Sequence, residues 1–268
     1  MNPGFAGTRT ARLGRAALLT MIAGTVGGAA VLAGQAVLAR SRTYAQPDFG
    51  LALRSTTGRT EAPPLRLVLL GDSSALGVGV SRVEETVGGQ LARLLAEGGP
   101  TGSRRVHLSS VGVSGSRSID LDTQVARALL GPAPDVAVIL IGANDVTTLR
   151  RPREAAAHLG AAVRRLLAAD VEVVVGTCPD LGAVRAIAAP LRQITAWQGQ
   201  RTARAQAEAV RRAGGTVVDI AAETGAVFRA DAATLCADGF HPSGDGYRVW
   251  AHALLPAVSA AVMSATRH

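Results

Sequence analysis

Residues 65–73 have the sequence LRLVLLGDS, in which a short apolar run ends at a glycine and two polar residues follow. Such a run, bounded by a turn-forming residue, is typical of a buried β-strand. Similar runs recur at residues 105–111, 135–141, 171–176 and 216–220. Helical spacing of apolar residues is seen at residues 84–97, 119–130, 153–169, 191–213 and 243–264. From residue 65 onward, predicted strands therefore alternate with predicted helices.

This alternation predicts an α/β fold with three layers, in which about five parallel strands lie between two layers of helices. The strand runs are almost continuous in Val, Ile and Leu, as expected where helices cover both faces of a sheet. We expect a single domain over residues 65–268. Ligands of such folds bind beyond the carboxyl ends of the strands, so the residues that directly follow each strand are the candidates for chemistry.

Residues 1–15 form a basic segment that contains Arg9, Arg12 and Arg15, and residues 16–39 carry no charged side chain. A helix of that length is long enough to cross the hydrocarbon core of a membrane. Two interpretations stay open: an uncleaved anchor, which the length favours, or a cleaved signal peptide. Residues 40–64 contain Pro and Gly without a sustained period, which predicts a linker. Either interpretation places the domain outside the cytoplasm.

The net charge of +8 does not indicate a nucleic-acid partner, because of where the charge lies. The chain has no Lys, so its 28 basic residues are all Arg. Residues 1–60 carry seven Arg and one acid, whereas residues 61–268 carry 21 Arg and 19 acids. A nucleic-acid-binding protein concentrates basic charge on its folded domain. Here the excess flanks the apolar segment, which indicates a membrane surface.

Acyl transfer requires a nucleophile, a base and hydrogen-bond donors for an oxyanion. Candidates for all three lie in the polar segments that follow predicted strands or precede the last predicted helix. Ser73 is a candidate nucleophile, and a serine hydroxyl needs a base to take its proton. His241 is the candidate base, and Asp238, three residues earlier, can hold its imidazole in one tautomer. The backbone amides of Ser73 and Gly115 and the side-chain amide of Asn144 can donate hydrogen bonds to an oxyanion.

These segments, in this order, resemble the motifs of the SGNH/GDSL hydrolase superfamily, and the resemblance covers residue 65 to the C-terminus. The motifs are Gly71-Asp72-Ser73, then Gly115, then Gly142-x-Asn144-Asp145, then Asp238-x-x-His241-Pro242. The resemblance implies a flavodoxin-like fold and esterase, lipase, thioesterase or sugar-deacetylase activity without a metal or other cofactor. The Arg-rich, Lys-free and exported character also resembles actinobacterial members that act in the cell envelope.

The resemblance implies a role for each matched residue. Ser73 is the expected nucleophile, Asp238 and His241 are the expected orienter and base, and Ser73, Gly115 and Asn144 form the expected oxyanion hole. The chain departs from the family at Ser74, where many members have Leu, but the register with Gly71 and Asp72 favours Ser73 as the nucleophile. Asp72 and Asp145 are expected to order their loops rather than to react.

Three functions are consistent with this pattern. The first is an exported esterase that hydrolyses short- to medium-chain acyl esters, including those of envelope lipids. The second is an envelope acyltransferase or carbohydrate deacetylase that uses the same triad on an acylated glycan. The third is a binding protein with a vestigial site, which the intact set of polar residues disfavours. The sequence lacks the lysine of a phosphate-binding P-loop and any spacing of ligands that suggests zinc.

Two further expectations concern the surroundings of the site. Cys178 follows the fourth predicted strand and Cys236 lies two residues before Asp238, so both are expected at the catalytic edge of the sheet. In an oxidising compartment they are predicted to form a disulfide that ties down the loop carrying His241, and the alternative is a pair of buried thiols. Residues 179–200 are expected to border the substrate pocket, and no long lid insertion is visible. The apolar residues available there for its lining are Leu181, Val184, Ile187, Leu191 and Trp197.

Overall fold

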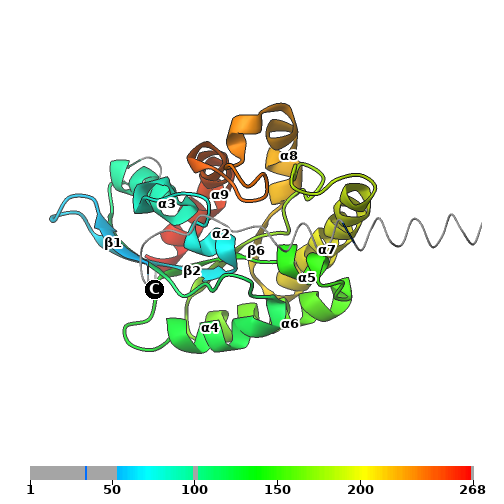
Figure 1. Ribbon diagram of the computed structural model, residues 1–268. Coiled ribbons are helices and arrows are strands. Elements are labelled where there is room, and N and C mark those ends of the chain that lie inside the picture. Colours follow the sequence, from blue (N-terminus) through cyan, green and yellow to red (C-terminus); the bar gives the residue numbers. More distant parts are fainter. Residues whose placement is uncertain (1–33, 35–52, 99–101, 267–268) are drawn as a thin grey trace, which may run out of the picture.

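Within the described residues, six strands form one sheet in the order β1-β3-β2-β4-β5-β6 (Figure 1). The structure, a computed structural model, describes residue 34, residues 53–98 and residues 102–266. The strands are β1 (Arg54–Thr57), β2 (Pro64–Gly71), β3 (Arg105–Ser110), β4 (Val136–Leu140), β5 (Glu172–Gly176) and β6 (Thr216–Val218). Strands β2 to β6 are parallel, and their spatial order is that of flavodoxin-like folds. The predicted three-layer α/β fold is therefore confirmed.

The strand β1 was not predicted. It pairs antiparallel with β3, with Arg54 opposite Ser109 and Thr57 opposite Val106. These residues lie in the segment predicted as a linker, so for residues 54–57 that prediction is wrong, and the sheet has a sixth strand. The strand consists of polar residues that are half-buried or exposed at the sheet edge, which is why it has no apolar run.

Helices cover both faces of the sheet (Figure 1). The α-helices are α2 (Ser73–Leu76), α3 (Val87–Glu97), α4 (Leu121–Ala128), α5 (Ala143–Thr147), α6 (Pro152–Leu167), α7 (Leu191–Ala213), α8 (Ile220–Ala230) and α9 (Gly244–Ala265). Short 3-10 helices are η1 (Val83–Glu85), η2 (Ser118–Asp120) and η3 (Ala232–Thr234). Helices α3 and α9 pack on one face, and α4, α6 and α7 pack on the other.

The side chains of β2 show why this strand is a continuous apolar run. Leu67 and Leu69 point into the core formed with α3 and α9, whereas Val68 and Leu70 point into the core formed with α4, α6 and α7. All four are at most 2% exposed. Because successive side chains of a strand point to opposite faces, a strand covered on both sides must be apolar at every position.

The predicted helices are present, and three further α-helices within the described part of the chain were missed. The helices α2 and α5 are single turns directly after β2 and β4, too short to show helical periodicity. Helix α8 begins at Ile220, where the fifth strand was expected to end. The side chain of Asp219 accepts a hydrogen bond from the amide of Ala222 and so ends the strand by capping this helix.

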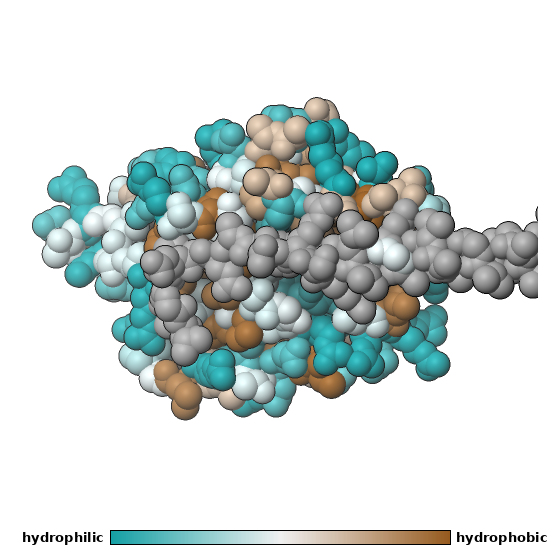
Figure 2. Space-filling view, viewed as in Figure 1, coloured by the Kyte–Doolittle hydropathy of each residue, from teal (hydrophilic) through white to brown (hydrophobic). Residues whose placement is uncertain are grey.

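The surface is mostly polar on the face shown in Figure 2, where hydrophobic residues lie in small groups between hydrophilic ones. Among the described residues, we find no helix with both the length and the apolar character needed to cross a membrane. The segment predicted as an anchor or signal peptide, residues 16–39, lies outside the described residues except for Gly34. The basic segment 1–15 lies outside them as well.

Candidate active site

Ser73 lies at the start of α2, directly beyond the carboxyl end of β2. The turn depends on Gly71, whose φ is +139°; a Cβ there would lie 1.8 Å from the carbonyl oxygen of Leu140 on β4. Asp72 then caps α2, because its Oδ1 accepts a hydrogen bond from the amide of Ser74 at 2.9 Å. The side chain of Ser73 is thereby held at the edge of the sheet, with the residue 7% exposed.

The His241 ring bridges Ser73 and Asp238. Its Nε2 lies 3.0 Å from Oγ of Ser73, and its Nδ1 lies 2.7 Å from Oδ2 of Asp238. Oδ1 of Asp238 accepts hydrogen bonds from the backbone amides of Phe240 and His241 at 2.6 and 2.9 Å. Ser73, His241 and Asp238 thus form one hydrogen-bonded row, although Ser73 and His241 are 168 positions apart in the sequence. The Asp238 carboxylate binds both the ring and the backbone amide of His241.

The charge state of Asp238 follows from these contacts. Burial of this carboxyl raises its pKa, but hydrogen bonds from the imidazole, the two backbone amides and the Cys236 thiol together bring the pKa well below its usual range. Asp238 is therefore ionised at neutral pH. An ionised carboxylate can only accept hydrogen bonds, so Nδ1 of His241 carries a proton, and in the neutral form of the ring the lone pair of Nε2 faces Ser73.

Asn144 and Asp145, on α5 after β4, hold the loop that follows β3. The side-chain amide of Asn144 donates to the carbonyl oxygen of Ser116 at 3.0 Å. The buried carboxylate of Asp145 accepts hydrogen bonds from the amide and the hydroxyl of Ser118, at 3.0 and 2.8 Å. Burial raises the pKa of Asp145, and the two bonds from Ser118 oppose this rise. Asp145 thus orders the neighbouring loop.

Gly115 lies in that loop and is exposed. Its φ of +82° is a backbone conformation that favours glycine, and a Cβ would meet no atom within 4 Å. The loop is tied to the turn that carries Ser73, because the amide of Val113 donates to the carbonyl oxygen of Gly71 at 3.1 Å. All the residues predicted for catalysis therefore follow strands at one edge of the sheet or lie in the loop before α9.

The predicted disulfide between Cys178 and Cys236 is wrong, since both cysteines are free thiols. Cys178 is fully buried in an apolar cluster between α5 and α7, and its Cβ lies beneath Gly142. The thiol of Cys236 instead hydrogen-bonds Asp238, and burial raises its pKa to about 11. The two sulfur atoms face different surroundings. The loop carrying His241 is held by hydrogen bonds rather than by a covalent link.

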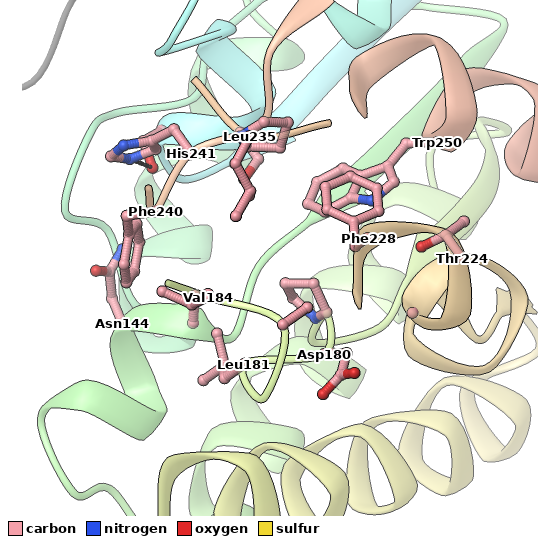
Figure 3. Close-up of a pocket in the computed structure, with 17 residues that line it drawn as sticks. Asn144, Asp180, Leu181, Val184, Thr224, Phe228, Leu235, Phe240, His241 and Trp250 are labelled. Carbon is pink, nitrogen blue, oxygen red and sulfur yellow. Dashed lines mark hydrogen bonds between the residues drawn. The ribbon is translucent and has the colours of Figure 1, made fainter. Parts of the chain in front are cut away.

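A pocket lies beside Ser73, Asn144 and His241, and its space of about 570 Å³ is in part open to solvent. It extends from these residues, past Leu235 and Leu181, to Phe228, Thr224 and Trp250 at its other end (Figure 3). Most of the lining is apolar, and the charged side chain of Asp180 lies at the far end, paired with Arg229. The pocket is therefore suited to an apolar group attached to a polar reacting centre.

The predicted lining of this pocket is partly right. Leu181 and Val184 line it, whereas Ile187 and Leu191 pack in the cluster beneath α5. Trp197 is 57% exposed on α7, outside the pocket, where Arg201 stacks on its ring. The lining residues contributed by α8, the loop before α9, and α9 itself were not predicted from the sequence. Those with large apolar side chains are Phe228, Leu235, Phe240 and Trp250.

A signal for these missed residues exists in the sequence. Aromatic residues make up only 3% of the chain, yet Phe228, Phe240, Tyr247 and Trp250 fall within a short stretch near the C-terminus. Tyr247 packs against Trp250 with ring centroids 6.1 Å apart, and Phe228 does so at 5.9 Å. This concentration of large apolar side chains around His241 indicates a pocket wall.

A model of the GDSL-like Lipase/Acylhydrolase family matches residues 69–249 of the chain, a range that includes every residue of the row Ser73–His241–Asp238. The chain belongs to this family. A GDSL-like esterase of Mycobacterium tuberculosis is 43% identical over 203 residues, which are 75% of this chain. The matched part spans 64% of the length of that relative.

Solved structures share the fold of this GDSL-like chain. A lipase/acylhydrolase from Enterococcus faecalis superposes with a TM-score of 0.56 at 21% identity, over 73% of this chain and 96% of that one. A catalytic mutant of an acetylxylan esterase from Geobacillus stearothermophilus gives a TM-score of 0.54 at 22% identity, over 75% of this chain and 94% of that one. At such identities the likeness shows the fold alone.

Proposed function

We propose that the protein is an exported serine esterase that hydrolyses carboxylic esters with short to medium acyl chains. The observation that carries this proposal is the position of the His241 ring between Oγ of Ser73 and the carboxylate of Asp238. Membership of the GDSL-like family supports ester hydrolysis as the reaction. The fold resembles that of lipases and esterases, but it does not decide the substrate.

The reaction follows from the protonation states. Nε2 of His241 accepts the proton of the Ser73 hydroxyl as Oγ attacks the ester carbonyl carbon, and a tetrahedral intermediate forms. When the intermediate collapses, the bond to the leaving alcohol breaks and the alcohol oxygen takes the proton from Nε2. A water molecule then attacks the acyl-enzyme and gives a proton to Nε2 of His241. When this second intermediate collapses, the bond to Oγ of Ser73 breaks, Oγ takes the proton from Nε2, and the carboxylic acid is released. Asp238 stabilises the imidazolium that forms in both steps.

The negative oxygen of the intermediate needs hydrogen-bond donors. The amide of Ser73 lies in the first turn of α2, where helix amides have no carbonyl partner within the helix. The amide of Gly115 lies on the exposed loop after β3. The Asn144 side chain has two N–H groups, one of which donates to Ser116. We assign these three groups to the oxyanion hole, with Gly115 required for the close approach of substrate to backbone.

The lining of the pocket supports the proposal that the acyl chain is of short to medium length. Its lining is apolar from Leu181 to Trp250, so an alkyl chain attached to the reacting carbonyl is removed from water there. Each buried methylene contributes about 0.8 kcal/mol, which makes the transition state of a longer ester more stable until the pocket is full. Phe228 and Trp250 lie at the far end of the pocket, so we expect the gain to end at a medium chain length.

The proposed location is outside the cytoplasm. The support is the uncharged stretch of residues 16–39, preceded by Arg9, Arg12 and Arg15, which is typical of a membrane anchor or an export signal. Esters accessible to an enzyme held there include those of envelope lipids and acylated glycans. Fractionation of cells that express the full chain tests the location: the protein is expected in the membrane or secreted fraction, and its recovery in the cytoplasm would contradict export.

The function is tested with a series of p-nitrophenyl esters from acetate to decanoate, on the full chain and on Ser73→Ala. We expect turnover that rises with chain length to an optimum and is lost in the variant. Turnover that survives in Ser73→Ala would falsify the assigned nucleophile. Turnover of the acetate alone would favour a deacetylase over an esterase for longer chains.

A further inference from the structure

Gln124 lies on α4, outside the row of proposed catalytic residues, and is 2% exposed. Its side-chain amide forms three hydrogen bonds at the catalytic edge of the sheet. Oε1 accepts from the amide of Gly71 at 2.7 Å. Nε2 donates to the carbonyl oxygen of Gly71 at 2.9 Å and to Oγ of Ser116 at 3.1 Å. The buried side chain of Gln124 therefore binds the backbone amide and carbonyl oxygen of Gly71, and also the hydroxyl of Ser116 in another segment.

The two partners of Gln124 adjoin the two backbone donors of the proposed oxyanion hole. Gly71 precedes Ser73 by two residues, and Ser116 directly follows Gly115. These donors belong to separate segments, one after β2 and one after β3. The distance between their amides depends on what joins the two segments, and Gln124 contacts both.

We infer that Gln124 is a positioning residue for the oxyanion hole. Its amide joins the turn that carries Ser73 and the Gly115 loop into one rigid unit and so sets the relative position of the Ser73 and Gly115 amides. The inference rests on the proposed function. Donors stabilise a transition state most when they are fixed in place before the reaction, and water cannot replace the bonds of a buried amide. Gln124 itself does not touch the reacting atoms.

Gln206 provides a matched control. It is fully buried on α7, and its amide forms the same kind of bridge between two other segments. Oε1 accepts from the amide of Cys178 at 2.8 Å, and Nε2 donates to the carbonyl oxygen of Ile141 at 2.9 Å. Neither partner adjoins the two backbone donors Ser73 and Gly115, although Ile141 precedes the side-chain donor Asn144 by three residues. Loss of Gln206 therefore removes comparable buried hydrogen bonds without separating the two backbone donors.

The test compares Gln124→Met and Gln206→Met in the full chain. Methionine has nearly the shape of glutamine but cannot form these bonds. For hydrolysis of p-nitrophenyl butyrate, we expect kcat of Gln124→Met to fall at least about tenfold, with KM changed less than about threefold. The inhibition constant of butylboronic acid, which forms a tetrahedral adduct with a serine, should rise by the same factor as kcat falls. Gln206→Met should show a smaller effect on both at a similar loss of Tm.

A second pair of variants keeps the test decisive where Gln124→Met does not fold. Ser116→Ala removes one of the three bonds and should lower kcat about threefold at constant KM. In Gln124→Glu, only the protonated carboxyl can donate to Gly71 or Ser116. Its activity relative to wild type should therefore decline as pH rises, whereas the relative activity of Ser116→Ala should not depend on pH.

Several outcomes overturn the inference. The first is a loss of kcat that is equal in Gln124→Met and Gln206→Met. The second is a kcat of Gln124→Met within threefold of that of the wild type. The third is a kcat of Ser116→Ala equal to that of the wild type. A relative activity of Gln124→Glu that does not change with pH also overturns it. Absence of turnover in the wild type overturns the proposed function and the inference together, so the two failures are distinguishable.

Discussion

At the scale of single residues, the Asp238 carboxylate has two tasks that a substitution can separate. One oxygen accepts from the backbone amides of Phe240 and His241, and the other accepts from Nδ1 of the imidazole. Asparagine can perform the first task with its carbonyl oxygen. For the second it offers an N–H group, which cannot accept a hydrogen bond.

We therefore predict that Asp238→Asn folds but loses activity. The amide would donate to Nδ1 and leave the proton on Nε2, so that His241 cannot take the proton of Ser73. The same substitution in a serine protease lowers kcat about 10⁴-fold, and we expect a loss of that order with p-nitrophenyl butyrate. Asp245→Asn, which alters an exposed ion pair with Arg248, is the control and should keep its activity. Activity of Asp238→Asn within tenfold of wild type would exclude this role.

Asp72 gives a prediction about stability and pH. Burial raises its pKa from 3.8 to about 6, against the hydrogen bonds from Ser74. Between about pH 4 and pH 6 the folded state binds more protons than the unfolded state, so stability falls as pH rises and stays lower above pH 6. Asp72→Asn keeps the cap on Ser74 and removes this titration.

We expect Asp72→Asn to match the wild type in stability near pH 4 and to exceed it by about 2–3 kcal/mol at pH 7. Urea unfolding at several pH values measures the difference. A difference that does not change between pH 4 and pH 7 would contradict the assignment. Because the change leaves Ser73 and His241 in place, activity serves as the check that the variant is correctly folded.

Single residues also show the limit of prediction from sequence. Ser73, Asp238 and His241 were predicted to lie together because each lies in a short motif with fixed spacing, and hydrogen bonds join them in the structure. Cys178 and Cys236 were wrongly paired, because sequence places both near the catalytic edge but does not show which way each thiol points. Gln124 was not noticed at all, since one glutamine on a helix carries no signal until its partners are seen.

At the scale of elements, the end of β2 depends on Gly71. A Cβ there would lie 1.8 Å from the backbone of β4, and neither strand can move without breaking the sheet. We predict that Gly71→Ala lowers the free energy of unfolding by several kcal/mol, from the clash together with the backbone strain of about 1–3 kcal/mol.

Gly131 is the matched control for this substitution. Its φ of +99° is similarly unfavourable for alanine, but a Cβ would meet no atom within 4 Å. Gly131→Ala should therefore cost only the strain. Equal losses of stability in the two variants, measured by urea unfolding, would show that the contact with β4 is unimportant.

The strands and helices that were predicted are those whose apolar residues follow a clear pattern along the sequence. The strands β2 to β6 and the helices α3, α4, α6, α7 and α9 bury one face or both, and burial imposes the apolar pattern that reveals them. Strand β1 is polar at an edge, and α2 and α5 are single turns. These three arise from pairing and from capping rather than from a pattern of their own, and for this reason they were not predicted. Helix α8 buries one face and was missed for another reason: Ile220, its first residue, was assigned to the end of the fifth strand.

At the scale of the whole molecule, the pocket is assembled from segments that lie far apart in the chain. Phe228 on α8 packs on Trp250 of α9, with ring centroids 5.9 Å apart, and together they line the end of the pocket opposite His241 (Figure 3). Sequence reasoning placed the pocket only beside residues 179–200, because the other wall depends on how α8 and α9 pack.

We predict that Phe228→Ala lengthens the preferred acyl chain. With the ring removed, about two more methylenes fit, and the ratio of kcat/KM for octanoate to that for butyrate should rise about tenfold. The variant should also lose about 3 kcal/mol of stability. Trp197→Ala, which removes an exposed aromatic ring outside the pocket, should leave the ratio unchanged. An unchanged ratio in Phe228→Ala would place the acyl chain elsewhere.

The antiparallel direction of β1 has a consequence for how the enzyme meets its substrate. Since Arg54 pairs with Ser109 near the end of β3, the chain enters the domain at the edge of the sheet that carries Ser73. Of the two interpretations of residues 16–39, an uncleaved anchor would make residues 40–52 the link between the membrane and this edge, and 13 residues span at most about 45 Å. Esters within that reach would be attacked as if at a high effective concentration. The length of the link, more than affinity for any one lipid, would then set which part of the envelope the enzyme samples.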